Sequence, residues 1–519
     1  MCRTAALAAV LIVSVLPAPR AAAAVRLPAV ISDHMVLQAG MNVPIWGWAD
    51  PGERVTVTLD GQSASAMAGP SGRWTVHLGP MKAGGPVAMT VAGRNTVTVK
   101  DILVGEVWLC AGQSNMELPL RESADAQAEI ARATYPRIRL FQHAEKRSAD
   151  EPLPDLPGQW AECSPETAAV FSAVGYYFGR DLHQALQAPV GLMASNWGGS
   201  LAEAWISQAS FDSDPDLKAA VEKYRKDMAG YIRTFEEKWA QWREDAQKAK
   251  AEGKPPPPQP PPVPDPKTIP GRPTTLYNAM IAPLVPFGIA GVIWYHGEAN
   301  VPRAYAYRKV LPALIGDWRR NWGQGDFPFL IVQLPNHEAR GALPEESEWA
   351  ELREAQWMAL AVPRTALAVT IDLGDSKDLH PKNKEDVARR LVLAALGTVY
   401  GKDVVYSGPL YESMKIEGRK ARIRFKHVGG GLAAKGGKLT GFAVADDDRQ
   451  FVWADAVIDG DTVVVSCRDV TRIVAVRYGW ADNPACNLYN QEGLPASPFR
   501  TDDWPGVTGG VKNEKKHHD

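Results

Sequence analysis

The stretch Gly105-Glu-Val-Trp-Leu-Cys-Ala-Gly-Gln-Ser-Asn-Met116 decides the fold class of this chain. Its apolar run from Val107 to Ala111 is typical of a buried strand, and Gly112 marks a sharp turn out of that strand. A serine at the end of a buried strand is where α/β enzymes place a nucleophile, because the strand fixes it and the loop exposes it. Ser114 is therefore a candidate nucleophile. The alternative is that Ser114 or Asn115 only caps the next helix.

The composition is that of a globular protein with several domains. Its 519 residues are too many for one hydrophobic core, which predicts two to four domains. The formal net charge of -2 gives no global field that would attract nucleic acid or an anionic membrane. The 17 tryptophans favour a carbohydrate ligand, because an exposed indole ring is a stacking surface for sugars.

Residues 1–24 have the pattern of a signal peptide. Arg3 supplies the positive charge, Ala5 to Leu16 the apolar stretch and Ala21 to Ala24 the small residues of a cleavage region. The apolar stretch is too short to span a bilayer, and no later segment resembles a transmembrane run. We expect an exported protein, periplasmic or extracellular, without membrane insertion.

Four cysteines follow this signal. An even number in an exported chain allows one or two disulfides, and four cysteines pair in three ways. Cys467 and Cys486 are the closest in sequence and are favoured as a pair over Cys110 and Cys163. None of the four has metal-ligand spacing, so no metal site is expected.

Sequence texture divides the rest of the chain. Residues 25–103 alternate short apolar runs with turn residues, which is typical of a β-sandwich. Between 104 and 400, short buried runs alternate with helix-like segments, as in a parallel sheet with crossover helices. Strand-and-turn texture returns over 401–505, and residues 506–519 form a polar tail. An insertion at 213–275 is charged, helix-favouring and then proline-rich, which predicts a surface helix or helical hairpin tied back by a stiff proline arm.

Three further segments lie at predicted strand-to-loop junctions. After one buried run, Gly198 and Gly199 allow close backbone approach and expose N–H groups, which suits an oxyanion stabiliser. The alternative, compatible with the first, is a helix start with Ser200 as N-cap and Glu203 completing a capping box.

The second segment is Trp294-Tyr-His-Gly-Glu-Ala-Asn300. Asn300 could aim its amide at a developing negative oxygen, a donor whose deletion typically costs about 3–4 kcal/mol of transition-state stabilisation. Alternatively it is a turn former. Glu298 would orient the loop or hydrogen-bond the asparagine.

The third segment, Asp372 to Lys384, contains His380 on a loop before a helix expected from about Pro381 to Val399. A histidine preceded by three aspartates suits a general base whose tautomer a carboxylate holds. The alternative is a solvated loop histidine. With Ser114, these groups make a complete set for acyl transfer. The chain lacks a G-x-S-x-G elbow, an H-E-x-x-H motif and a dinucleotide glycine fingerprint, which disfavours the usual α/β-hydrolase layout, metal hydrolysis and hydride transfer.

Four blocks resemble those of the sialate O-acetylesterase family, a branch of the SGNH (GDSL-like) hydrolases. They are GQSNM at Gly112–Met116, NWGGSLAEAW at Asn196–Trp205, WYHGEAN at Trp294–Asn300 and DLHPKNK at Asp378–Lys384. The resemblance extends to Leu27–Gln38, Tyr478–Trp480 and Asn487–Asn490, and so covers nearly the whole mature chain. It implies a three-layer, flavodoxin-like α/β/α SGNH hydrolase domain flanked by β-sandwich-like domains, and cofactor-free hydrolysis of acetyl esters on sugars.

The resemblance also implies roles for individual residues. Ser114 would be the nucleophile and His380 the base. Asp378 is favoured as the orienting acid and Asp375 is its rival, while a dyad oriented by a backbone carbonyl is a third arrangement. Many SGNH enzymes separate the aspartate and histidine by two residues, and here only one residue lies between Asp378 and His380.

The N–H of Ser114, the Gly198-Gly199 loop and Asn300 would form the oxyanion hole. Gln113 and Glu298 are assigned to the same oxyanion and substrate-binding region. Many relatives have Gln in place of His296, so pocket polarity near Glu298 is expected to differ.

The expected partner is an acetylated sugar or glycan, with a sialate ester as the family precedent. An acetyl-xylan or other polysaccharide deacetylase is the alternative enzyme, because no arginine pair can be assigned to a sialate carboxylate. A non-catalytic carbohydrate-binding protein is the alternative of another class, and the presence of Ser114, Asn300 and His380 argues against it. No nucleic acid, cofactor or metal is expected, and the sequence gives no indication of oligomeric state.

Overall fold

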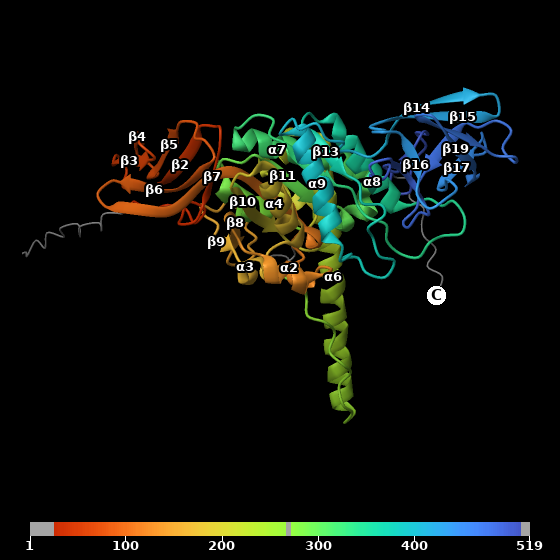
Figure 1. Ribbon diagram of the computed structural model, residues 1–519. Helices are drawn as coiled ribbons and strands as arrows, with labels where there is room; N and C mark the ends of the chain where they lie inside the picture. The colour runs from red at the N-terminus through yellow and green to blue at the C-terminus, as the bar shows by residue number, and fades with distance from the viewer. Residues whose placement is uncertain (1–24, 266–270, 510–519) are drawn as a thin grey trace, which may run out of the picture.

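The computed structural model describes residues 25–265 and 271–509. The predicted signal peptide, residues 1–24, lies outside the described residues. Figure 1 shows a central body of helices and strands with a β-rich region on either side and one long helix standing out from it. No helix in the described part of the chain combines the length and the apolar composition needed to cross a membrane.

The central body is built on a mainly parallel sheet with the order β13-β12-β11-β7-β10-β8-β9, in which only the edge strand β9 is antiparallel to its neighbour. Its strands are β7 (Thr96–Gly112), β8 (Tyr135–His143), β9 (Gly158–Cys163), β10 (Val190–Asn196), β11 (Gly291–Tyr295), β12 (Phe329–Val332) and β13 (Thr365–Ala368). Strands β10, β11 and β12 are buried along their whole length, which is why they appear in the sequence as continuous apolar runs. With the β8–β9 pair set aside, the order is the flavodoxin-like 2-1-3-4-5.

Helices cover both faces of this sheet. Trp108 of β7 packs against Phe178 of α4 (Ala173–Leu186), and Trp294 of β11 packs against Trp318 of α7 (Ala304–Trp322). Because Trp294 pairs in register with Ala111, three positions after Trp108, the two tryptophans point to opposite faces. The three-layer α/β/α fold is therefore confirmed.

The remaining helices and short turns lie around this core. They are α1 (Ser114–Glu117), α2 (Ala126–Arg132), α3 (Pro165–Val170), α5 (Gln208–Ser213), α6 (Pro215–Ala251), α8 (Glu348–Met358), α9 (Lys384–Thr398), the 3-10 turns η1 (Leu120–Glu122), η2 (Ala202–Trp205), η5 (Ala282–Leu284), η6 (Glu298–Arg303) and η7 (Ala359–Ala361), and the π-helical turn η4 (Tyr277–Ile281). Helix α9 packs against α4 and over β12 and β13, whereas α8 packs against α7.

The N-terminal β-rich region shares a strand with the central sheet. The first part of β7 pairs with β6 and β1, and its second part lies between β10 and β11. The other strands of this region are β1 (Val36–Gln38), β2 (Val43–Trp48), β3 (Arg54–Leu59), β4 (Gln62–Met67), β5 (Arg73–Leu78) and β6 (Gly84–Ala92), with β2 and β5 forming a second sheet. The chain thus passes residue 103, where the sequence texture changes, within one continuous strand.

The C-terminal β-rich region has its own hydrophobic core. Its sheets are β14-β15-β20-β19, β18-β17-β21-β23 and β16-β22. The strands are β14 (Leu410–Glu417), β15 (Lys420–Lys426), β16 (Leu432–Ala434), β17 (Phe442–Ala445), β18 (Val452–Trp453), β19 (Asp455–Asp459), β20 (Thr462–Ser466), β21 (Ala475–Tyr478), β22 (Leu488–Asn490) and β23 (Phe499–Arg500).

Helix α8 joins this region to the central body. The fully buried Arg353 donates hydrogen bonds to the carbonyls of Leu334 and Pro335 in the central body and of Ala481 and Asp482 in the C-terminal region. A buried cation on this seam is stabilised because four carbonyl oxygens replace its water.

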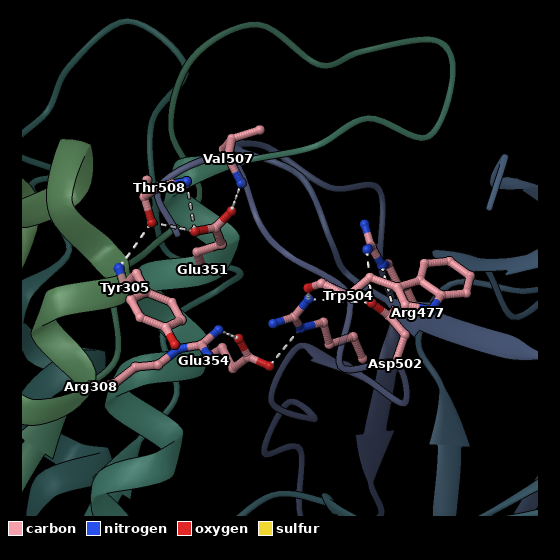
Figure 2. Close-up of polar contacts among 10 residues, drawn as sticks. Tyr305, Arg308, Glu351, Glu354, Arg477, Asp502, Trp504, Val507 and Thr508 are labelled. Carbon is pink, nitrogen blue, oxygen red and sulfur yellow. Dashed lines mark hydrogen bonds and ion pairs between the residues drawn. The ribbon is translucent and has the colours of Figure 1, made fainter. Parts of the chain in front are cut away.

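A second set of contacts on α8 holds the end of the described chain (Figure 2). Glu354 pairs with Arg308 of α7 and Arg500 of β23, at 2.5 and 2.8 Å. The N–H of Val507 and the hydroxyl of Thr508 donate to Glu351. Residues 507 and 508, which the sequence analysis places in a polar tail, therefore lie against α8.

The described part of the insertion consists of one long helix and a proline-rich segment that runs back along it. Asp214 caps α6 by accepting the N–H groups of Asp216 and Leu217. The indole N–H groups of Trp239 and Trp242 donate to carbonyls of the proline segment, those of Pro261 and Pro257, at 2.7 and 2.9 Å. Of the two predicted forms, the structure has the single surface helix with a proline arm, and Figure 1 shows α6 projecting from the body.

The disulfide prediction is wrong. All four cysteines of the described chain, Cys110, Cys163, Cys467 and Cys486, are free thiols. Burial raises the pKa of Cys486 to about 11. Its side chain packs where Gly441 and Gly479 leave room, beside Tyr478, so closeness in sequence to Cys467 does not bring the two sulfur atoms together.

Candidate active site

The structure brings Ser114 and His380 together although 266 positions separate them. Strand β7 ends at Gly112, which has a φ of +144°. A Cβ at this position would come 2.1 Å from the Tyr295 carbonyl oxygen, so only glycine fits there. Ser114 is the first residue of α1. Its Oγ lies 2.8 Å from Nε2 of His380, within hydrogen-bond distance for a nucleophile and its base.

The pair lies at the topological switch point of the sheet. Strand β7 has β10 on one side and β11 on the other, and ligands of such sheets bind beyond the carboxyl ends of the strands at this point. A cleft of about 620 Å³ opens there. It is lined by Ser114, Glu117, Leu118, Pro119, Arg121, Glu122, Gln142, His143, Lys146, Val170, Ser172, Ala194, Asn196, Gly198, His380 and Lys382.

His380 is presented by a loop that is longer than expected. Helix α9 begins at Lys384 and not near Pro381, because the Asn383 side chain caps it by accepting the N–H of Asp386. Burial and the nearby Lys384 lower the pKa of His380. The imidazole is therefore neutral near pH 7 and can accept a proton.

The two candidate acids are placed differently. Asp378 Oδ1 lies 3.8 Å from Nδ1 of His380, longer than a hydrogen bond, and accepts the backbone N–H of His380 at 2.8 Å. That N–H and the nearby Lys382 lower the pKa of Asp378. The carboxylate of Asp375 accepts the N–H of Lys377. Of the two, Asp378 is the one whose carboxylate faces the imidazole.

A buried polar network that the sequence analysis missed is centred on Asn115, the residue after Ser114. Asn115 donates to Glu298 at 2.5 Å and to the carbonyl of Leu379 at 3.0 Å, and accepts from Lys384 at 2.5 Å. Burial lowers the pKa of Lys384 to about 7 and raises that of Glu298. The asparagine bonded to Glu298 is thus Asn115 and not Asn300. Because no sequence rule marks a lone buried lysine, only the position of Lys384 inside a family block could have indicated it.

Gln113 and His296 support the loop after β11 from within the protein. The Oε1 of Gln113, a buried residue, accepts the N–H groups of Gly297 and Ala299, both at 3.4 Å. His296 is fully buried and lies 2.9 Å from the carbonyl oxygen of Ser200. Burial lowers the pKa of His296 to about 3, so it stays neutral.

The predicted oxyanion residues separate into two groups. Gly198 lies at the cleft, where an added Cβ would come 3.2 Å from that of Ser114, and neighbouring Gly199 is exposed with a φ of +70°. Asn300 is fully buried, and its amide accepts from the N–H of Ala202 and donates to Glu203, both at 3.0 Å. The structure therefore does not bring the Asn300 amide to the cleft.

The alternative capping box at this turn is wrong. The 3-10 turn η2 has Leu201 at its N-cap position and no side-chain cap. The hydroxyl of Ser200 accepts the indole N–H of Trp205, and Glu203 is engaged by Asn300 and Arg303. Ser200 is thus bonded to a side chain five positions further on and Glu203 to two distant side chains, and neither caps the backbone of the turn.

Glu117 is the second feature that the sequence analysis missed. Its Oε2 accepts the N–H of Gly198 at 2.6 Å, and its Oε1 forms an ion pair with Lys146. The carboxylate thus occupies the donor that was assigned to the oxyanion hole. An acidic residue three positions after the serine, in the first turn of α1, was the available signal.

One group of side chains in the described ranges has metal-ligand spacing, namely His34, Asp101 and Glu162. The guanidinium of Arg139 lies among them, 2.5 Å from Asp101 and 3.3 Å from Glu162. This cation already neutralises the acidic side chains, and the group is distinct from the Ser114 cleft.

A flavodoxin-like sheet with a serine–histidine pair at its carboxyl edge has the architecture of a hydrolase of the SGNH type. The comparisons with known proteins agree. Residues 268–395 match the family model described as carbohydrate esterase, sialic acid-specific acetylesterase. The chain is 32% identical to the rat sialate O-acetylesterase and 31% identical to the human one, covering 91% and 93% of this chain and 94% of each relative.

A solved structure extends the similarity to the fold. The crystal structure of a carbohydrate acetylesterase from Xanthomonas citri is 38% identical, with a TM-score of 0.79 over 93% of this chain and 100% of that one. The chain belongs to the sialate O-acetylesterase family. It is a carboxylic ester hydrolase.

Proposed function

We propose that Ser114 and His380 carry out the hydrolysis of O-acetyl esters on carbohydrates, the activity to which family membership assigns this chain. The observation that carries the assignment of residues is the 2.8 Å contact between Ser114 Oγ and His380 Nε2 in an open cleft. The hydroxyl needs a base to become a nucleophile, and the neutral imidazole supplies it.

The reaction has two halves. His380 takes the Ser114 proton as Oγ attacks the acetyl carbonyl, and the tetrahedral intermediate collapses when His380 returns the proton to the departing sugar oxygen. Water, deprotonated by the same imidazole, then attacks the acetyl-serine, and acetate leaves as Ser114 is regenerated.

The negative oxygen of each intermediate needs donors close to Ser114. The N–H of Ser114 is at the first position of a helix, where backbone donors have no acceptor within the helix. The N–H of Gly198 is the second donor, and it is now bonded to Glu117. The substrate oxygen must therefore replace the Glu117 carboxylate, which keeps Lys146 as its partner.

The sugar proposed as substrate is an O-acetylated sialic acid. Besides Lys146, which stays with Glu117, two basic side chains line the cleft, Arg121 and Lys382. Their ion pairs with Glu122 and Asp378 are long, 3.9 and 3.6 Å, so both cations suit the carboxylate of an acidic sugar. The relatives named sialate O-acetylesterases support the same choice. The sequence of residues 1–24 supports export to the periplasm or the extracellular space as part of this proposal.

The test is acetate release from a panel of O-acetylated sialosides and acetylated xylan, with Ser114→Ala as the inactive reference. The variant should fold normally and lose at least 1,000-fold in rate (about 4 kcal/mol), since the covalent step is gone. Near-full activity of Ser114→Ala would show that Ser114 is not the nucleophile. If acetate is released from acetylated xylan and not from the sialosides, the substrate is an acetylated polysaccharide and not a sialic acid ester.

A further inference from the structure

Of the tryptophans of this chain, ten are buried, six are partly exposed and one is exposed. All 17 lie in the described residues, and Trp453 at the end of β18 is the most exposed, with 41% of its surface accessible. A single exposed apolar ring is ordinary at a protein surface, so what distinguishes Trp453 is the cavity beside it.

Trp453 borders a cavity of about 230 Å³ outside the Ser114 cleft. Arg449 and Phe451 line the same cavity from the C-terminal region, and Glu345 lines it from the segment before α8. No residue lining this cavity also lines the cleft. Its volume is just below the usual range of about 300–1,000 Å³ for small-molecule pockets, which suits a single ring and excludes a large cofactor.

The aromatic walls of the cavity are held in place. The indole N–H of Trp453 donates to the carbonyl of Ala342 at 2.9 Å, which restrains the ring. The guanidinium of Arg477 lies 4.0 Å from the centre of the Phe451 ring and is bound by Asp502 at 2.9 Å and Glu346 at 2.8 Å. Figure 2 shows Arg477 with Asp502. Walls that do not have to be ordered on binding favour affinity.

The polar side chains of the cavity suit a hydroxylated ligand. The Arg449 guanidinium lies 5.3 Å above the ring of Trp504, and Glu345 adds a carboxylate to the lining of the cavity. A pyranose has an apolar C–H face that stacks on an indole ring and equatorial hydroxyls that bond to planar charged groups. A flat apolar ligand would form no hydrogen bond with either charged side chain.

We propose that this cavity is a second sugar-binding site, which holds one pyranose residue of a glycan while the acetylated residue is processed in the cleft. The choice of a sugar rests on the proposed carbohydrate esterase activity. The site would raise the affinity for polymeric substrates, because a glycan held at this cavity presents its acetylated residue to the cleft at a higher effective concentration.

The experiment measures glycan binding without turnover. The full-length Ser114→Ala protein is run by affinity electrophoresis through gels containing a sialylated mucin or acetylated xylan. The same background then carries Trp453→Ala, Trp453→Phe, Arg449→Ala or, as a matched control with a similarly exposed aromatic ring on α6, Tyr231→Ala. In protein with Ser114 intact, Trp453→Ala is also assayed on a small chromogenic acetate ester.

We expect Trp453→Ala and Arg449→Ala to weaken retention by at least about tenfold, while Trp453→Phe and Tyr231→Ala keep it within about threefold. The rate on the small ester should not change, which separates loss of this site from failure of the esterase assignment. Retention of Trp453→Ala and Arg449→Ala equal to that of their parent would overturn the proposal. So would a parent protein that neither glycan retards.

Discussion

Replacing Asp378 by asparagine tests how far the Ser114–His380 pair depends on a third residue. The side chain of Asp378 is 41% exposed and its carboxylate lies 3.8 Å from the imidazole, outside hydrogen-bond range. Asparagine preserves the acceptor for the backbone N–H of His380, so the loop should keep its shape. The substitution therefore removes only the charge.

The magnitude follows from the distance and the exposure. Two unit charges about 4 Å apart interact by about 1 kcal/mol in bulk water and about 4 kcal/mol at an effective dielectric constant of 20. Because more than a third of the Asp378 side chain is exposed to solvent, which screens its charge, the lower figure applies, and it corresponds to roughly a fivefold loss in kcat/KM. A buried aspartate that hydrogen-bonds the histidine is worth about 10,000-fold.

The pH profile gives a second measurement with a definite sign. His380 acts only when neutral, so kcat/KM is lost as pH falls through its pKa, which burial and Lys384 hold below the ordinary value of about 6.5. Asp378→Asn removes a charge that stabilises the imidazolium, so the acidic limb should move to lower pH. Lys382→Met removes a positive charge that destabilises the imidazolium, so the acidic limb of the pH profile should move to higher pH.

The assay is steady-state hydrolysis of a chromogenic acetate ester between pH 4.5 and 8, with Asp375→Asn as the matched control. We expect the control to stay within about twofold of the wild type. A loss of 1,000-fold or more in Asp378→Asn would refute the argument from distance, since the carboxylate would then have to hydrogen-bond the histidine during turnover. A larger loss in Asp375→Asn than in Asp378→Asn would give the orienting role to Asp375.

Three further substitutions test other parts of the structure. Glu117→Gln weakens the hydrogen bond to the Gly198 N–H, because a neutral acceptor binds less strongly than a carboxylate. The kcat/KM on a neutral acetate ester should therefore rise about threefold, and a fall would mean that Glu117 assists the reaction. Gly198→Ala places a Cβ 3.2 Å from that of Ser114 and 3.3 Å from Glu117 Oε2, and kcat should drop about tenfold with little change in thermal stability; an unchanged kcat would show that Gly198 does not contact the reacting group. Arg353→Met leaves the carbonyls of Leu334, Pro335 and Ala481 without their donor, whereas that of Asp482 keeps the N–H of His337. Since each unsatisfied group costs about 1–3 kcal/mol, urea unfolding should show a loss of at least about 3 kcal/mol in stability; a loss below 1 kcal/mol would mean that water replaces the guanidinium.

Local patterns in the sequence were sufficient for the architecture. The apolar run before Gly112 and those near 190, 291, 329 and 365 correspond to strands of the central sheet. They were recognisable because a strand buried on both faces must be apolar along its length. The charged insertion likewise became the surface helix α6, since its composition offers no apolar face wide enough for the core.

Errors occurred where a side chain bonds to a partner other than the one its local sequence pattern predicts. Ser200 and Glu203 have the spacing of a capping box, but Trp205, Asn300 and Arg303 bind them. Likewise, the two cysteines nearest in sequence do not pair. Capping and cysteine rules consider neighbours in sequence, and they cannot include the competing partners that packing supplies.

By itself, the sequence determined that Ser114 follows a buried strand and that His380 precedes a helix, because strand and helix formation depend on residues only a few positions apart. Tertiary structure alone decided that these two side chains meet, that the Asn300 amide faces Glu203, and that Glu117 holds the N–H of Gly198. These contacts join residues about 80 to 270 positions apart. The parallel sheet brings the ends of its strands to one edge, and side-chain packing then fixes which polar groups are bonded inside and which remain available to a substrate.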